Sequence, residues 1–345
     1  MISRNNIITV FLITIVTISQ FYYSYKFSDP GFGNSDFYQY KEMVIQPFSA
    51  DSSRSPFVYR QFTTSIASLL YNVGIFYNTE ISFNTDNITQ RIYFALLTSN
   101  YIGLIFCFLT IIFFIKRHVK QKSVVYYFFP IFFILTSFGY LFNGLSVLTE
   151  GWTYFFNTII FILIIERKIV LTVAFLLLSL LNKEITSIII ASISFFLLVH
   201  PLRLKKIDRY YLKVLIQSVF CFVKYLTIRL FLVPIEGGDN QTNFNEIVLN
   251  IKDFTLNFEF IKQSILSLSA IIILILLITV NKRYSEILRD KINFSIFSTI
   301  IILFIIGIMS GIGNNIGRIV SSMTPIIILT CLKYFDKEYE ENLPF

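Results

Sequence analysis

Charged residues are scarce in this sequence. Asp, Glu, Lys and Arg make up only 14% of its 345 residues, whereas hydrophobic residues make up 55%. Soluble domains average about 25% charged residues, so water is not the expected solvent for most of the surface. Apolar runs recur from one end of the chain to the other, with no stretch of soluble-domain length between them. We therefore interpret residues 1–345 as a single integral membrane domain.

Cysteine and histidine are also few. Cys107, Cys221 and Cys331 lie inside apolar segments, which favours packing roles over a disulfide framework or a metal site. His118 and His200 lie in basic loops, and no cluster of His, Cys and Asp has zinc-ligand spacing. The sequence also lacks a phosphate-binding loop, a dinucleotide fingerprint and a G-x-S-x-G motif. We expect no cofactor; a divalent metal is the alternative, and no paired-acid motif supports it.

The apolar runs predict an all-α fold, a polytopic transmembrane helical bundle of about ten spans, because a spanning helix needs about 20 mostly apolar residues. Three of the runs, between residues 152 and 199, are short for a span. The first run has no small-residue cleavage site after it and is interpreted as an uncleaved signal anchor. The candidate spans are residues 7–23, 92–115, 123–148, 152–165, 169–181, 185–199, 211–233, 261–280, 294–310 and 319–335.

The positive charges predict the orientation of these spans. The formal net charge is +8, and the basic residues gather in short loops at 116–122, 203–209 and 281–293. Basic loops between apolar spans typically face the cytoplasm, where they meet anionic lipid headgroups, so membrane lipids rather than nucleic acid are the expected partners. This orientation places both termini in the cytoplasm. Residues 24–91 and the acidic loop 234–260 then lie on the extracytoplasmic side.

The large extracytoplasmic loop 24–91 contains a second kind of helical pattern. Apolar residues recur at three- and four-residue steps between positions 59 and 77, at Phe62, Ile66, Leu69, Leu70, Val73 and Tyr77. This period is typical of an amphipathic helix. We predict a helix over residues 59–76 that lies on the outer membrane interface.

Several acidic residues fall on this outer side, and each has a structural alternative. Asp36, just beyond the first span, is a candidate catalytic base or a helix N-cap, and Asp29 is a substrate contact or a turn residue. Glu150 is a site carboxylate or a solvated loop residue. The adjacent Lys183 and Glu184 interrupt an apolar run, either as site residues or as a turn between two short spans.

Two arginines complete the outer set. Arg60 begins the amphipathic helix, and Arg318 follows the glycine-rich turn 311–317. A guanidinium binds phosphate with two donors. The alternatives are a lipid-headgroup anchor for Arg60 and a snorkelling helix end for Arg318. The topology was assigned from other residues, yet it gathers all these charges on one face, as expected for a reaction between a lipid phosphate and an extracytoplasmic acceptor.

Three short motifs resemble segments of small bacterial membrane proteins of the GT-C glycosyltransferase superfamily. Residues 56–62 (PFVYRQF) resemble a P-F-x-Y-R-x-L segment, residues 181–184 (LNKE) resemble an N-R/K-E turn, and Gly317, Arg318 and Pro325 resemble a closing G-R-x-x-x-x-x-x-P segment. Asp36 stands just beyond the first span, where the superfamily keeps its aspartate. Asp36 has no second acid beside it and no soluble domain follows the last span, both of which depart from the larger members of the superfamily.

The resemblance implies a hexosyl or pentosyl transferase of the bacterial plasma (inner) membrane. It would transfer a sugar from a polyprenyl-phosphate donor to a glycan or lipid acceptor of the cell surface. The alternatives are a transporter of lipid-linked sugars and a non-catalytic subunit of a polysaccharide assembly complex. The implied catalytic residues are Asp36, Glu150 and Glu184, and the implied substrate-binding residues are Asp29, Tyr59, Arg60, Lys183 and Arg318.

Overall fold

The computed structural model describes most of the chain. The described residues are 4–27, 36–49, 59–76, 78, 80–81, 85–118, 124–136, 149–200, 208–229, 244–268, 271–273, 275–276, 290–309 and 313–335. Within them every regular element is helical, which confirms the predicted all-α class. The helices are α1 (Arg4–Phe27), α2 (Asp36–Ile45), α3 (Gln61–Val73), α4 (Asn87–His118), α5 (Val124–Thr136), α6 (Glu150–Ile165), α7 (Ile169–Leu180), α8 (Ile185–Val199), α9 (Arg209–Thr227), α10 (Phe244–Leu256), α11 (Phe258–Ser267), α14 (Lys291–Met309), α15 (Gly313–Ser321) and α16 (Thr324–Phe335).

Two of the described helices, α4 and α14, are long and apolar enough to cross a membrane. This indicates membrane association. The helices α6, α7 and α8 are apolar but shorter, and their bounds lie within two residues of the short predicted spans. Each of them ends at a polar turn, at residues 166–168, 181–184 and 200, because the apolar run stops there.

The last predicted span, residues 319–335, is wrong as a single helix. The chain breaks at Ser322 and Met323, so that α15 precedes the break and α16 follows it. The hydroxyls of Ser321 and Ser322 donate to the Arg318 carbonyl oxygen over 2.9 and 3.4 Å, and such side-chain bonds compete with the helical ladder. Pro325 is the second residue of α16, where its missing N–H costs nothing.

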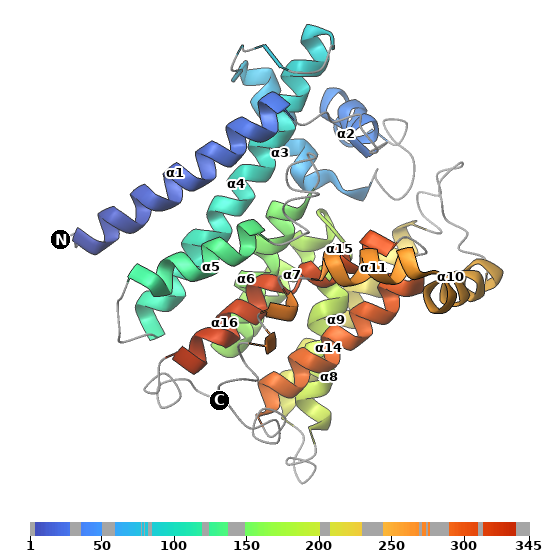
Figure 1. Ribbon diagram of the computed structural model, residues 1–345. Helices are drawn as coiled ribbons and strands as arrows, with labels where there is room; N and C mark the ends of the chain where they lie inside the picture. Colours follow the sequence, from blue (N-terminus) through green and yellow to red (C-terminus); the bar gives the residue numbers. More distant parts are fainter. Residues whose placement is uncertain are drawn as a thin grey trace.

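The helix α6 lies at the centre of the larger hydrophobic core, packed against α4, α7, α8 and α16. In Figure 1, α1, α4 and α5 lie on one side of it and α8, α9 and α14 on the other. The crossing of α4 and α6 depends on two glycines. A Cβ at Gly103 would meet the Trp152 backbone nitrogen at 2.7 Å, and one at Gly151 would clash with the Asn100 carbonyl oxygen. Cys107, Cys221 and Cys331 are buried free thiols, as the packing interpretation predicted.

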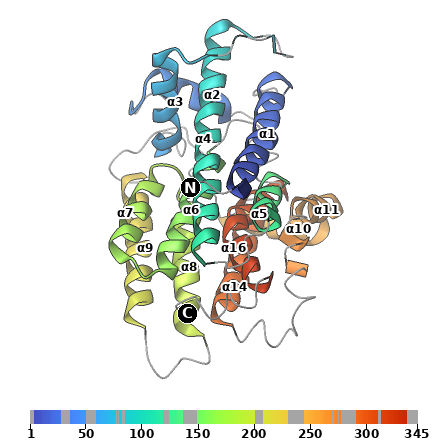
Figure 2. The ribbon, with the colours of Figure 1, turned by 90° about the vertical axis from the view of Figure 1, so that its left-hand side faces the viewer.

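The helix predicted at residues 59–76 is present as α3, but its apolar face is divided. Phe62 and Ile66 pack against the core, whereas Leu69 and Val73 are 66% and 74% exposed. The face that packs against the protein consists mainly of small polar residues: Gln61, Thr63, Thr64, Ala67 and Ser68. Small side chains allow α3 to approach α4 closely, and the Ser99 hydroxyl donates to the Thr63 carbonyl oxygen over 2.8 Å. Figures 1 and 2 show α2 and α3 beside the N-terminal half of α4.

Candidate functional site

The Glu150 carboxylate is fully buried between two cations. Its Oε1 atom accepts hydrogen bonds from Lys183 Nζ over 2.8 Å and from Arg318 Nε over 3.1 Å. Its Oε2 atom is also buried and has no hydrogen-bond partner among the described residues. Buried carboxylate oxygens are normally paired. This oxygen is therefore an acceptor that a bound hydroxyl or water would satisfy.

A second ion pair lies beside the first. Arg60 Nη2 contacts Glu184 Oε1 at 3.3 Å, and Arg60 Nη1 donates to the Tyr40 hydroxyl over 3.2 Å. Arg60 is only 8% exposed, and Glu184 directly follows Lys183 in the chain. We call Arg60, Glu150, Lys183, Glu184 and Arg318 the charge cluster. It contains three cations and two carboxylates.

Local structure explains why the charge cluster forms at this point. Glu150 is the first residue of α6, Arg60 directly precedes α3, and Lys183 and Glu184 occupy the turn between α7 and α8. The Phe62 backbone N–H donates to the Leu181 carbonyl oxygen over 2.8 Å. The first N–H groups of a helix have no partner within that helix. At the start of α3, the α7–α8 turn supplies a partner for one of them. The turn and the start of α3 are thus held side by side.

Burial changes the protonation of Lys183. Removal from water lowers the pKa of its ammonium group to about 8, with Glu150 opposing this effect and Arg318 and Arg60 adding to it. The folded state therefore binds the Lys183 proton less tightly than the unfolded chain does. Its contribution to stability rises with pH between about 8 and the ordinary lysine value.

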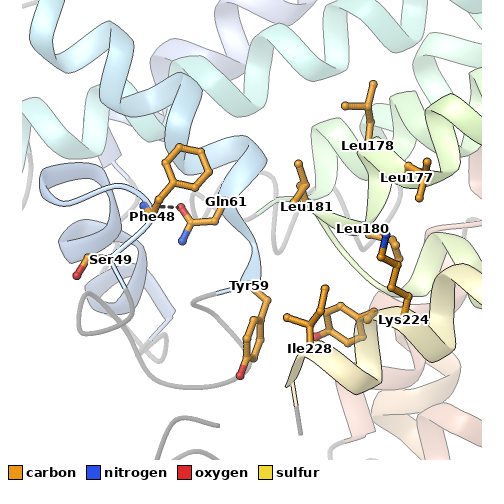
Figure 3. Close-up of a pocket in the computed structure, with 11 residues that line it drawn as sticks. Phe48, Ser49, Tyr59, Gln61, Leu177, Leu178, Leu180, Leu181, Lys224 and Ile228 are labelled. Carbon is orange, nitrogen blue, oxygen red and sulfur yellow. Dashed lines mark hydrogen bonds between the residues drawn. The ribbon is translucent and has the colours of Figure 1, made fainter. Parts of the chain in front are cut away.

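An apolar cavity of about 550 Å³ lies near the charge cluster, although no member of the cluster lines it. Tyr59 and Gln61 line it and flank Arg60, and Leu181 lines it just before the Lys183–Glu184 pair. The Tyr225 ring faces the Tyr59 ring, with centroids 6.1 Å apart. Figure 3 shows Phe48 and Gln61 on one side of this space and Lys224 and Ile228 on the other. The remaining lining residues are Ser49, Leu177, Leu178 and Leu180.

The structure thus brings together five of the sequence-predicted site residues, as the charge cluster, and places Tyr59 beside them. The Tyr59 hydroxyl donates to the Arg229 carbonyl oxygen over 3.2 Å. Asp36 is the first residue of α2, and both its catalytic role and its N-cap role stay predictions. Its side chain, like the whole of Asp29, lies outside the described part of the chain.

Sequence reasoning missed three residues of this region. Tyr40 lies one turn after Asp36 on α2, Asn182 directly precedes Lys183, and Tyr225 lies near the end of α9. The sequence indicates Asn182 only as part of the LNKE motif at residues 181–184. Tyr40 and Tyr225 are two of 20 tyrosines in the chain, and nothing in their sequence context marks them, because the contacts with Arg60 and Tyr59 are made across long stretches of chain.

No known family model, curated protein or solved structure matches the chain. Within the described residues, no three His, Cys, Asp or Glu side chains come together as a metal site would require. Two features define the site: a cluster of opposite charges that is largely buried, and a neighbouring apolar cavity. Both lie in a chain whose described regular elements are all helical, two of them of membrane length.

Glu150→Gln tests whether the charge cluster is as tightly coupled as its geometry indicates. The neutral amide would leave the buried Lys183 and the partly buried Arg318 without their carboxylate, and we expect a loss of about 3–5 kcal/mol in the free energy of unfolding. Glu259→Gln is the matched control, because its partner Lys262 and the Glu259 side chain are 52% and 64% exposed, and we expect about 0–1 kcal/mol there. Thermal unfolding of the purified protein in detergent provides the measurement. Equal losses in the two variants would contradict the coupling.

Proposed function

We propose that this protein is a membrane glycosyltransferase of the GT-C type, which transfers a sugar from a polyprenyl-phosphate carrier to a cell-surface glycan or lipid on the extracytoplasmic face. The observation that carries the proposal is that Tyr59 and Gln61, which line the apolar cavity, directly flank Arg60 of the charge cluster. A lipid phosphate has the same two parts, a long hydrocarbon chain and an anionic head.

The cavity suits the hydrocarbon chain of such a donor. Leu177, Leu178, Leu180 and Leu181 form one wall, and Leu177, Leu178 and Leu181 are each more than 40% exposed. The chain of a polyprenyl carrier already lies in lipid, so the cavity would hold it by van der Waals packing against these leucines. The lining includes few polar groups, chiefly Lys224, Tyr59, Tyr225 and Gln61. These would lie near the head of the ligand.

The cations of the charge cluster suit the phosphate. Arg60 and Arg318 each carry a planar guanidinium, which matches two phosphate oxygens at once. In transfer, the acceptor oxygen forms a bond to the sugar C1 atom while the bond from C1 to the phosphate oxygen breaks. The phosphate leaves with the electron pair, and the arginines would stabilise the charge that develops on it.

The acceptor hydroxyl must lose its proton as it attacks. We assign the base to Asp36 on the resemblance described above, and the proton would pass to its carboxylate. The unpaired Glu150 Oε2 atom would accept a hydrogen bond from the acceptor, and Glu184 would hold Arg60 in place. Lys183, Asp29 and Tyr59 would share in binding the substrate.

The proposal includes the ten-span topology with cytoplasmic termini in the plasma membrane. Contacts between loops support it, because residues assigned to the same side touch each other. On the proposed inner side Arg117 binds Glu166 at 2.9 Å and Arg167 binds Asp208 at 2.8 Å. On the proposed outer side the charge cluster joins four separate segments.

The topology predicts that cysteines at positions 120 and 205 are protected from an impermeant thiol reagent in intact cells, whereas a cysteine at position 239 reacts. External labelling at 120 would overturn it.

Donor binding is tested with farnesyl phosphate as the probe. In Arg60→Lys and Arg318→Lys a point charge replaces the two-pronged guanidinium. We expect binding about ten- to a hundredfold weaker in each, because charge-assisted hydrogen bonds contribute roughly 1.5–3 kcal/mol. Arg167→Lys is the matched control, since Arg167 also pairs with a carboxylate but is not among the residues that line the cavity. Affinity unchanged in all three variants would reject the phosphate-binding role.

The catalytic role of Asp36 is tested with polyprenyl-phosphate-linked sugars, by following release of the lipid phosphate. Asp36→Asn keeps the side-chain size but removes the basic oxygen, and we expect a loss of about 10²- to 10⁴-fold in rate. Glu42→Gln, an exposed acid on the same helix α2, is the control and should retain the rate. Asn caps a helix about as well as Asp, so a normal rate in Asp36→Asn would favour the N-cap alternative and assign the base to Asp29 or Glu150.

A further inference from the structure

Asn182 makes three hydrogen bonds with one buried side chain. It is only 1% exposed. Its Nδ2 atom donates to the Thr149 carbonyl oxygen over 3.1 Å and to the Thr153 hydroxyl over 3.0 Å. Its Oδ1 atom accepts from the Thr63 hydroxyl over 2.6 Å. Both halves of the amide are therefore in use, and the orientation of the side chain is determined from opposite ends.

The partners of Asn182 belong to the segments that carry the charge cluster. Thr149 directly precedes Glu150 at the start of α6, and Thr63 lies one turn after Arg60 on α3. Asn182 itself directly precedes Lys183 and Glu184. One side chain thus joins three segments that hold four of the five charged residues. The backbone bond from Phe62 to Leu181 runs beside it and links two of the same segments.

We propose that Asn182 is a positioning residue, which sets the separations of Arg60, Glu150 and the Lys183–Glu184 pair by joining α3, α6 and the α7–α8 turn. The consequence for donor binding rests on the function proposed above, whereas the positioning itself does not. Ion pairs taken out of water are favourable only when their geometry is close to ideal. A neutral amide supplies two donors and an acceptor without adding another charge to the cluster.

An Asn that merely stabilises the fold would make a different prediction, and the chain offers a matched residue for the comparison. Asn157 lies on α6, the helix that also carries Thr153. It is fully buried and donates to the Ser322 carbonyl oxygen over 2.8 Å. That bond joins α6 to the break between α15 and α16 instead of to α3 or the α7–α8 turn. Loss of either asparagine removes a buried hydrogen bond, but only loss of Asn182 releases the turn that carries Lys183.

The test measures the chemical reactivity of Lys183 in the full-length protein in detergent. Acetic anhydride is applied in short pulses across a range of pH, and acetylation at Lys183 is followed by peptide mass spectrometry. In the wild-type protein, burial should make the reaction slow. In Asn182→Ala, which removes all three hydrogen bonds, we expect the limiting rate at high pH to rise by roughly tenfold or more, because one lost hydrogen bond corresponds to about two- to tenfold. We also expect its pH midpoint to move up toward that of ordinary lysines, because Lys183 gains water.

Asn157→Ala should also lower the melting temperature, while leaving the Lys183 rate and midpoint unchanged. Thr63→Val removes only the 2.6 Å bond and should give a smaller rise, which keeps the test decisive if Asn182→Ala does not fold. Unchanged Lys183 reactivity in Thr63→Val and Asn182→Ala, or an equal rise in Asn157→Ala, would overturn the proposal. The measurement needs no donor, so a failure of farnesyl phosphate to bind would reject the proposed function without affecting this result.

Discussion

The buried Glu150 carboxylate, held between Lys183 and Arg318, is the interaction on which the rest of the site depends. A carboxylate removed from water is costly unless cations and hydrogen bonds surround it. Glu150 begins α6, and its partners lie in the α7–α8 turn and in α15, so three segments must meet at one point. The absence of a side chain at Gly151 lets the start of α6 lie directly against α4. Local packing and charge placement are thus parts of the same arrangement.

The ion pairs at the two ends of the helices differ in their exposure to solvent. At the end that the proposed topology places in the cytoplasm, Arg117 and Arg167 are 51% and 46% exposed and pair with Glu166 and Asp208. Burial raises the pKa of the Glu166 carboxyl, but Lys168, Arg117 and His118 outweigh that effect and bring its pKa below the ordinary value. Such exposed pairs add little to stability. Among the described residues, the charge cluster combines burial with a neighbouring cavity, and buried charges of that kind concentrate at functional sites.

Much of the helical organisation could be predicted from apolar runs. The segments 152–165, 169–181 and 185–199 appear as α6, α7 and α8 because their ends coincide with polar turns. The break at Ser322 and Met323 could not be predicted from hydropathy, since it arises from hydroxyl bonds to the Arg318 carbonyl oxygen. The face of α3 that packs on α4 was missed for a similar reason. Small polar residues such as Thr63 are buried there by contacts with Ser99 and Asn182, which lie far away in sequence.

The charged members of the site could be predicted because a charge beside an apolar run is conspicuous. Their pairing could not, since Arg60 and Glu184 are 124 positions apart and Glu150 and Arg318 are 168 apart. The cavity left no signal in the sequence, because its leucines belong to an ordinary apolar helix. Asn182 stood next to a recognised charge pair, yet its role follows only from partners on α3 and α6.

The proposed function requires the cavity to hold the hydrocarbon chain of a lipid phosphate whose head lies at the charge cluster. Photo-crosslinking tests it most directly, with an isoprenyl phosphate that carries a diazirine on its chain, followed by peptide mapping. We expect crosslinks within residues 177–181 and 224–228, the two segments that contribute to the cavity lining. Excess farnesyl phosphate should suppress these crosslinks, whereas the uncharged alcohol farnesol should not. Crosslinks spread evenly over the lipid-facing helices, or equal suppression by both competitors, would contradict it.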